Sequence, residues 1–97
     1  MPLYVTLANW TDQGARDVKD SVKRGEAFVA GAEKMGCKVH QLVWTMGPHD
    51  IVAIIEAPND AVFSSLALGL GKLGNVRGLS MRAFTKEEMG KITQAIP

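Results

Sequence analysis

Residues 46–56 read MGPHDIVAIIE, and this stretch decides the fold because it joins a polar turn to the most apolar strand in the chain. Gly47 and Pro48 interrupt regular structure, and proline fixes its own φ angle. The run from Ile51 to Ile55 is β-branched at four of its five positions. Such a run is too short to span a membrane and is typical of a strand buried on both faces. We therefore expect a hairpin in which residues 38–46 form the preceding strand.

Two more strands are predicted on either side of this hairpin. Residues 3–10 alternate with the two-residue period of a strand, and residues 76–84 supply the last strand. Leu3, Val5 and Leu7 share one face, and Tyr4, Thr6, Ala8 and Trp10 share the other. In the second strand we expect strict alternation, with His40 and Leu42 on the same face.

Helical spacing covers the segments between the strands. One long helix or two consecutive helices run to Gly36, with a break near Asp20, and a second main helix follows Asn59. Thr85 and Glu88 have the spacing of a capping box that opens a short last helix. The chain is thus predicted to be a single α+β domain, residues 1–97, with the ferredoxin-like order β-α-β-β-α-β plus a C-terminal helix.

The second face of the predicted sheet is as apolar as the first. In this fold both main helices cover one face, so the other face needs a partner. A second copy of the chain is the simplest one, and two stacked sheets would form a dimeric α/β barrel. We therefore expect the protein's partner to be itself, as a homodimer or a higher multiple.

The bulk composition excludes several classes of protein. With 11 basic and 10 acidic residues the net charge is +1, so we expect neither nucleic acid nor membrane as a partner. Asp12 with Arg16 and Asp20 with Arg24 have the spacing of ion pairs on a helix surface. The single cysteine, Cys37, is interpreted as a buried thiol, which indicates a reducing compartment. No signal peptide or membrane span is recognisable, so a cytoplasmic location is expected.

The motifs for catalysis and metal binding are weak. The two histidines, His40 and His49, are predicted to lie a strand length apart, with His40 near Glu56, so no metal and no cofactor are predicted. His49 beside Asp50 has two interpretations: an oriented acid or base, or a solvated imidazole next to a carboxylate that accepts hydrogen bonds within its own turn.

A glycine pattern near the end of the second main helix resembles a nucleotide-binding motif. Residues 69–74 read GLGKLG and match the spacing G-x-G-x-x-G. A dinucleotide site needs these glycines after a strand and before a helix, whereas here they end a helix and precede a strand. We interpret them as a helix end.

The first strand also carries candidate ligand-binding residues. If Leu3, Val5 and Leu7 meet the helices, then Tyr4, Thr6 and Trp10 point into the space between two sheets. Aromatic and hydroxyl groups of this kind line small-molecule pockets as readily as interfaces.

Blocks of residues along nearly the whole chain resemble the GYD-domain family of small bacterial proteins. These blocks are Tyr4–Gly14, Lys19–Ser21, Lys23-Arg24, Ala32–Gly36, Thr45–Gly47, Asp50–Val52, Glu56–Pro58, Leu73–Arg77 and Arg82–Thr85. The resemblance implies a ferredoxin-like fold, a dimeric α/β barrel and no established activity. The family's naming motif, glycine, any residue, tyrosine, aspartate, falls on residues 47–50, where His49 replaces the tyrosine. Val22 stands where the family commonly has proline.

Three functional hypotheses follow. The first is a homo-oligomeric barrel that binds a small, partly aromatic or acidic molecule between sheet and helices. Its candidate ligand-binding residues are Tyr4, Asn9, Trp10, His49 and Asp50. The second is an enzyme of the barrel-monooxygenase kind, in which His49 or Asn9 positions a substrate. The third is a structural or assembly module without a ligand. No catalytic residue is assigned.

Overall fold

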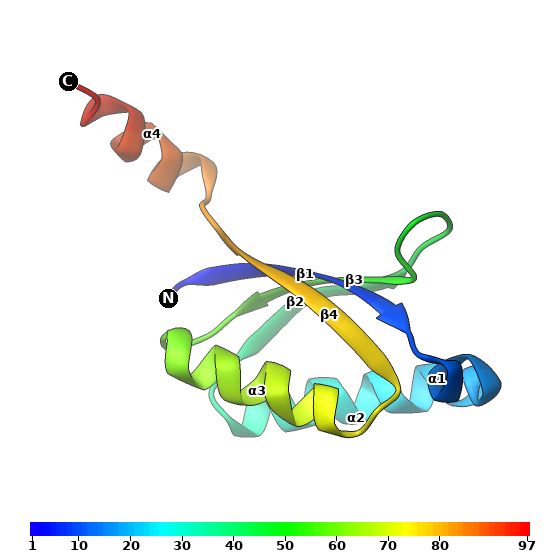
Figure 1. Ribbon diagram of the computed structural model, residues 1–97. Coiled ribbons are helices and arrows are strands. Elements are labelled where there is room, and N and C mark those ends of the chain that lie inside the picture. Colours follow the sequence, from blue (N-terminus) through cyan, green and yellow to red (C-terminus); the bar gives the residue numbers. More distant parts are fainter.

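The computed structural model describes residues 1–97 and contains one antiparallel sheet with its two longest helices on the same face (Figure 1). The four strands are β1 (Leu3–Trp10), β2 (Lys38–Trp44), β3 (Ile51–Glu56) and β4 (Val76–Ala83). Their order across the sheet is β2-β3-β1-β4, and every neighbouring pair is antiparallel. The predicted ferredoxin-like fold is confirmed, with β2 and β4 slightly shorter than expected.

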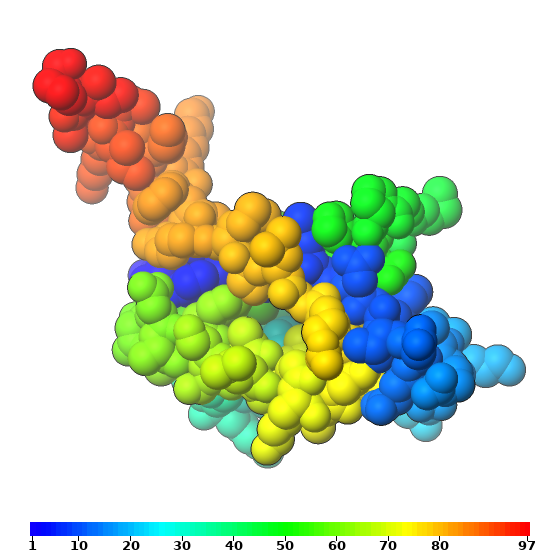
Figure 2. All heavy atoms as spheres, in the orientation of Figure 1, coloured from blue at the N-terminus to red at the C-terminus, as the bar shows by residue number.

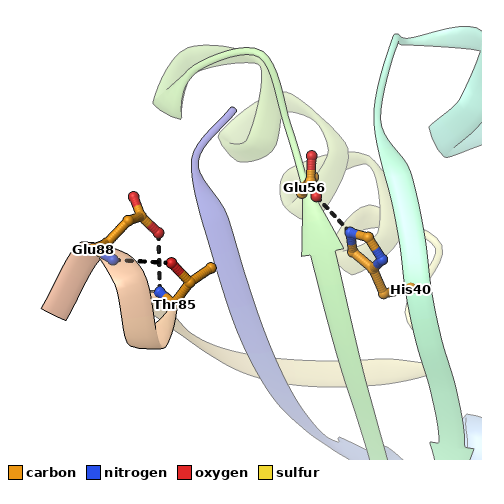
Figure 3. A network of polar contacts seen from close by, with 4 residues as sticks. All are labelled: His40, Glu56, Thr85 and Glu88. Atoms are coloured by element: carbon orange, nitrogen blue, oxygen red, sulfur yellow. Dashed lines mark hydrogen bonds and ion pairs between the residues drawn. The ribbon is translucent and has the colours of Figure 1, made fainter. Parts of the chain in front are cut away.

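The helices that follow Asn59 and Thr85 begin at their predicted caps. The helical segments are α1 (Asp12–Arg16), the 3₁₀ turn η1 (Val18–Asp20), α2 (Ser21–Lys34), α3 (Asp60–Lys72) and α4 (Lys86–Gln94). The break predicted near Asp20 is therefore confirmed. Asn59 Oδ1 accepts from the amide of Val62 at 2.9 Å and begins α3. Both bonds of the capping box form between Thr85 and Glu88 at the start of α4 (Figure 3).

The faces of β1 are the reverse of those that the hypothesis of a pocket between two sheets assumed. Tyr4 and Ala8 are buried beneath the helices, and the Tyr4 ring stacks on Phe63 of α3 with ring centroids 4.0 Å apart. Leu3, Val5 and Leu7 consequently lie on the open face. Alternation shows which residues share a face, but it does not show which face the helices cover. Tyr4 can be buried because its hydroxyl donates to Asp60 at the start of α3.

A β-bulge also breaks the alternation expected in β2. The pairing register shifts between Val39 and Gln41, so Val39 pairs with Ile55 on the helix-covered face, and Leu42 lies on that same face.

The prediction that His40 lies near Glu56 is confirmed, since His40 Nε2 is 2.6 Å from Glu56 Oε1 (Figure 3). This hydrogen bond lowers the pKa of the Glu56 carboxyl.

The buried core is small for a chain of this length. Only 11 of the 97 residues are buried, and eight of them form one cluster where α3 and the end of α2 meet the sheet, around Ile55, Phe63 and Leu66. Cys37 belongs to this core, as predicted. Burial raises the pKa of the Cys37 thiol and is the main reason that the pKa of the Tyr4 phenol is raised.

These raised pKa values predict a loss of stability at alkaline pH. The folded state keeps protons that the unfolded chain releases above its ordinary pKa values, about 8.5 for cysteine and 10 for tyrosine. The two groups should therefore make their whole contribution to the free energy of unfolding at neutral pH. The free energy of unfolding should fall above about pH 9, by at most about 1.4 kcal/mol per pH unit for each group. Denaturant titrations from pH 7 to 11 measure this. Tyr4→Phe should flatten the decline above pH 10, and a wild-type curve that stays level to pH 11 would contradict the prediction.

The last helix leaves the body of the molecule. In Figure 1, α4 extends beyond the sheet on the side opposite α2 and α3, as does the loop between β2 and β3. The radius of gyration is 14.6 Å, against about 12.5 Å expected for a compact chain of this length. Met89 and Ile92 of α4 are 48% and 41% exposed. No helix is both long and apolar enough to cross a bilayer.

Candidate functional site

The loop between β2 and β3 is tied to the end of β1 by side chains predicted as site residues. Asn9 Nδ2 donates to the Pro48 carbonyl at 2.8 Å, and Asn9 Oδ1 lies 3.0 Å from His49 Nδ1. The backbone amide of Trp10 donates to Asp50 Oδ2 at 3.0 Å. The fold therefore brings Asn9, His49, Asp50 and the main chain of Trp10 together.

Neither interpretation of the His49–Asp50 pair describes these contacts. The imidazole forms a hydrogen bond with the side chain of Asn9. The Asp50 carboxylate accepts a hydrogen bond from a backbone amide of β1 rather than from its own turn. Because the Asn9 amide nitrogen already donates to a carbonyl, its oxygen faces the ring, and His49 Nδ1 is the donor. His49 and Asp50 thus hold the loop in place, and no carboxylate orients the imidazole as an acid or base.

The other predicted residues lie apart from this loop. Tyr4 is at the opposite end of β1, in the core against Phe63. The Trp10 side chain faces the helices, as does Thr6, whose hydroxyl is 2.8 Å from that of Ser80. Trp10 therefore has two environments: its amide fixes the loop, and its indole lines a cleft beneath the sheet.

This cleft lies between the sheet and the two main helices and has a volume of about 390 Å³. Phe28 of α2, Leu66 of α3, and Trp10 and Ala53 of the sheet contribute to its mainly apolar lining. Figure 2 shows the surface hollowed between α3 and β4, with more distant atoms visible behind the opening. A volume of this size falls in the range of about 300–1,000 Å³ that small-molecule pockets occupy.

Glycines on the facing helices keep the cleft open. A Cβ atom added to Gly31 of α2 or Gly69 of α3 would meet no atom within 4 Å, although both residues line the cleft. Glycine inside a helix costs about 1 kcal/mol relative to alanine. The space that larger side chains would fill is thus left empty in the single chain.

Two hydrogen-bond donors lie at one end of the cleft. Trp10 Nε1 is buried and has no hydrogen-bond partner. Arg24 Nη1 donates to the Asp17 carbonyl at 2.8 Å, and its Nη2 is 3.3 Å from Ser21 Oγ. Arg24 Nη2 also lies 3.4 Å from the carbonyl oxygen of Gly14. A Cβ atom added to Gly14 would lie 3.2 Å from Trp10 Cδ1, so both side chains lie against Gly14.

The ion pairs predicted on the first helical segment are absent. The one ion pair in the structure joins His40 and Glu56. Asp20 belongs to η1 and precedes α2, so it does not share a helix face with Arg24. The guanidinium of Arg24 is therefore contacted only by neutral oxygen atoms.

The sequence contained a signal for the cleft that we did not interpret as one. Gly25 and Gly31 interrupt the helical pattern of α2, and Gly69 and Gly71 that of α3, and all four line the cleft. Gly69 and Gly71 fall in the last turns of α3, and Gly74 has a φ of +83°, which confirms a helix end in place of a nucleotide-binding turn. The structure contains no group of three or more His, Cys, Asp or Glu side chains arranged to hold a metal ion.

Comparison with known proteins identifies a family and a relative. The family model of the GYD domain matches residues 4–93. A protein of Thermus thermophilus, named glutamine synthetase and cystathionine beta-lyase binding protein, is 27% identical over 85 residues, which cover 87% of this chain and 90% of the relative. The chain therefore belongs to the GYD domain family.

Proposed function

We propose that this GYD-domain protein is a homodimer in which each subunit binds one small, largely apolar molecule in the cleft between sheet and helices. The observation that carries the proposal is a cleft of about 390 Å³ whose lining includes Trp10, a residue whose indole N–H is buried without a partner. A buried donor without an acceptor costs about 1–3 kcal/mol, and a ligand that supplies the acceptor removes that cost.

The homodimer is supported by the open face of the sheet. Its exposed or half-buried apolar residues are Val5, Leu7, Val43, Val52, Ile54, Leu79 and Met81. The chain exposes 6519 Å², whereas a compact monomer of this mass exposes about 5,400 Å². The excess of about 1,100 Å² is comparable to the roughly 800 Å² that each partner buries in a standard interface.

The projections beside this face suit a second copy of the chain. Both α4 and the β2–β3 loop rise on the open side of the sheet (Figure 1). Stacked sheets lie about 10 Å apart, so such projections would extend past the sheet of the partner. Exposed Phe84, Met89 and Ile92 would then contact the second subunit. The cleft would remain open because it lies on the opposite side of the sheet.

Thermal denaturation tests the ligand-binding function. A molecule that binds only the folded protein should stabilise it by about 2.7 kcal/mol when present at 100 times its dissociation constant. We expect apolar or amphipathic metabolites to raise the melting temperature and small hydrophilic ones to leave it unchanged. Mass spectrometry of a chloroform–methanol extract of the purified protein would identify a copurifying ligand. An empty protein that no apolar compound stabilises would contradict the function.

The relative from Thermus thermophilus supports a second candidate, the binding of a metabolic enzyme. Its printed name concerns glutamine synthetase and cystathionine beta-lyase, and the two chains match over most of their lengths. Sedimentation velocity of this protein mixed with glutamine synthetase, and in a second sample with cystathionine beta-lyase, each from its own host, tests this candidate. If this protein sediments apart from the enzyme in both mixtures, the candidate is wrong. The barrel-monooxygenase alternative has less support, since His49 contacts an amide and no carboxylate.

A further inference from the structure

We infer that the ligand of the cleft is an amphipathic anion, a molecule with an apolar body and one carboxylate that binds Arg24 and the indole N–H of Trp10. This inference rests on the proposed ligand-binding function and specifies the chemistry of the ligand. Three features of the cleft support it.

The first feature is the charge of the lining. Arg24 is the only charged side chain among the residues that line the cleft, and no aspartate, glutamate, lysine or histidine is present there. A guanidinium beside an apolar cavity, with no acid to neutralise it, favours an anion over a neutral or cationic ligand. No acidic side chain of the lining thus neutralises the positive charge.

The second feature is the placement of the two donors. Trp10 Nε1 is buried without a partner, and Arg24 holds neutral oxygens of Asp17, Ser21 and Gly14. Both side chains belong to the lining of the cleft and contact the same residue, Gly14, just outside that lining. A carboxylate has two oxygens, so one can accept from the indole N–H while the other accepts from the guanidinium.

The third feature is the apolar surface beyond these donors. Phe28, Ile55 and Leu66 line the rest of the cleft, and the hydroxyls of Thr6 and Ser80 bond each other. This part of the cleft offers little to a polar chain, whereas a hydrocarbon or aromatic body would gain about 25 cal/mol for each Å² removed from water. A single acidic head and an apolar tail therefore match the two ends.

Titration of the wild-type protein with three eight-carbon probes tests the charge preference. Octanoate, 1-octanol and octylamine have the same tail and differ in head group. We expect octanoate to bind at least about tenfold more tightly than 1-octanol, because hydrogen bonds to charged groups are stronger than neutral ones. Octylamine should bind more weakly than either. Calorimetry measures all three affinities.

Variants and spectra locate the head group. Arg24→Gln should lower the affinity for octanoate about tenfold and leave that for 1-octanol within about twofold. Arg16→Gln, an exposed arginine outside the cleft, is the matched control and should change neither. The indole N–H resonance of Trp10, assigned with Trp44→Phe, should move on addition of octanoate.

The possible failures are distinguishable. If 1-octanol binds as tightly as octanoate, or if Arg24→Gln keeps the wild-type affinity for octanoate, the inference is wrong while the ligand-binding function stands. An unmoved Trp10 resonance in saturated protein would also overturn it. If none of the three probes binds at millimolar concentration, both the inference and the proposed function are wrong.

Discussion

Replacement of Leu79 by glutamate is expected to convert the proposed dimer into a monomer at micromolar concentration. Leu79 lies on the open face of β4 and is 58% exposed in the single chain, so a charge there should cost the subunit little stability. In a face-to-face dimer the same carboxylate would be buried, and each of the two symmetry-related subunits would contribute one. An unpaired charge buried in the interface destabilises the dimer by about 3–5 kcal/mol, so the dissociation constant should rise at least a hundredfold.

Leu68→Glu is the matched control for this substitution. Leu68 is 74% exposed, lies on α3 and lines neither the open face nor the cleft. Sedimentation equilibrium should give a dimer mass for the wild type and for Leu68→Glu, and a monomer mass for Leu79→Glu. Equal masses for all three proteins would exclude the open face as the interface. Unchanged circular dichroism would show that Leu79→Glu still folds.

The order and ends of the elements could be predicted because they depend on neighbours in the sequence. Asn59 and Thr85 each cap a helix by accepting from the amide three residues later, and such contacts are visible as local patterns. The run from Ile51 to Ile55 forms β3 with the predicted bounds. These features need no information about the rest of the fold.

The faces of the sheet could not be predicted because both faces are apolar. Tyr4 and Val5 are neighbours, and either could have faced the helices by hydrophobicity alone. The choice depends on Phe63 and Asp60, which lie more than fifty positions away and receive the Tyr4 ring and hydroxyl. The bulge near His40 is equally invisible, because it is defined by the pairing with β3.

The candidate site divides in the same way. Asn9, His49 and Asp50 were selected as polar residues near turns, and the fold does gather them, but as partners that fix a loop. Arg24 was interpreted as half of a surface ion pair, because i, i+4 spacing on one continuous helix was assumed. The 3₁₀ turn that places Asp20 before α2 leaves the guanidinium for the cleft.

Replacement of Gly31 by leucine is expected to stabilise the empty protein and to abolish ligand binding. The position lines the cleft, and an added Cβ would meet no atom within 4 Å. Leucine in place of glycine inside a helix gains about 0.8–1 kcal/mol, and burial of the side chain against the cleft wall adds up to about 2 kcal/mol. The melting temperature should therefore rise by at least about 4 °C.

The leucine side chain would fill the same space that the ligand needs. The gain in stability and the loss of ligand binding should therefore appear together. Octanoate, which should raise the melting temperature of the wild type, should leave that of Gly31→Leu unchanged. Gly90→Leu is the control: Gly90 lies in α4, has equally open space around its Cβ position and does not line the cleft. It should gain the helix-propensity part of the stability and keep the response to octanoate. A Gly31→Leu protein that is stabilised by octanoate as strongly as the wild type would place the binding site outside the cleft.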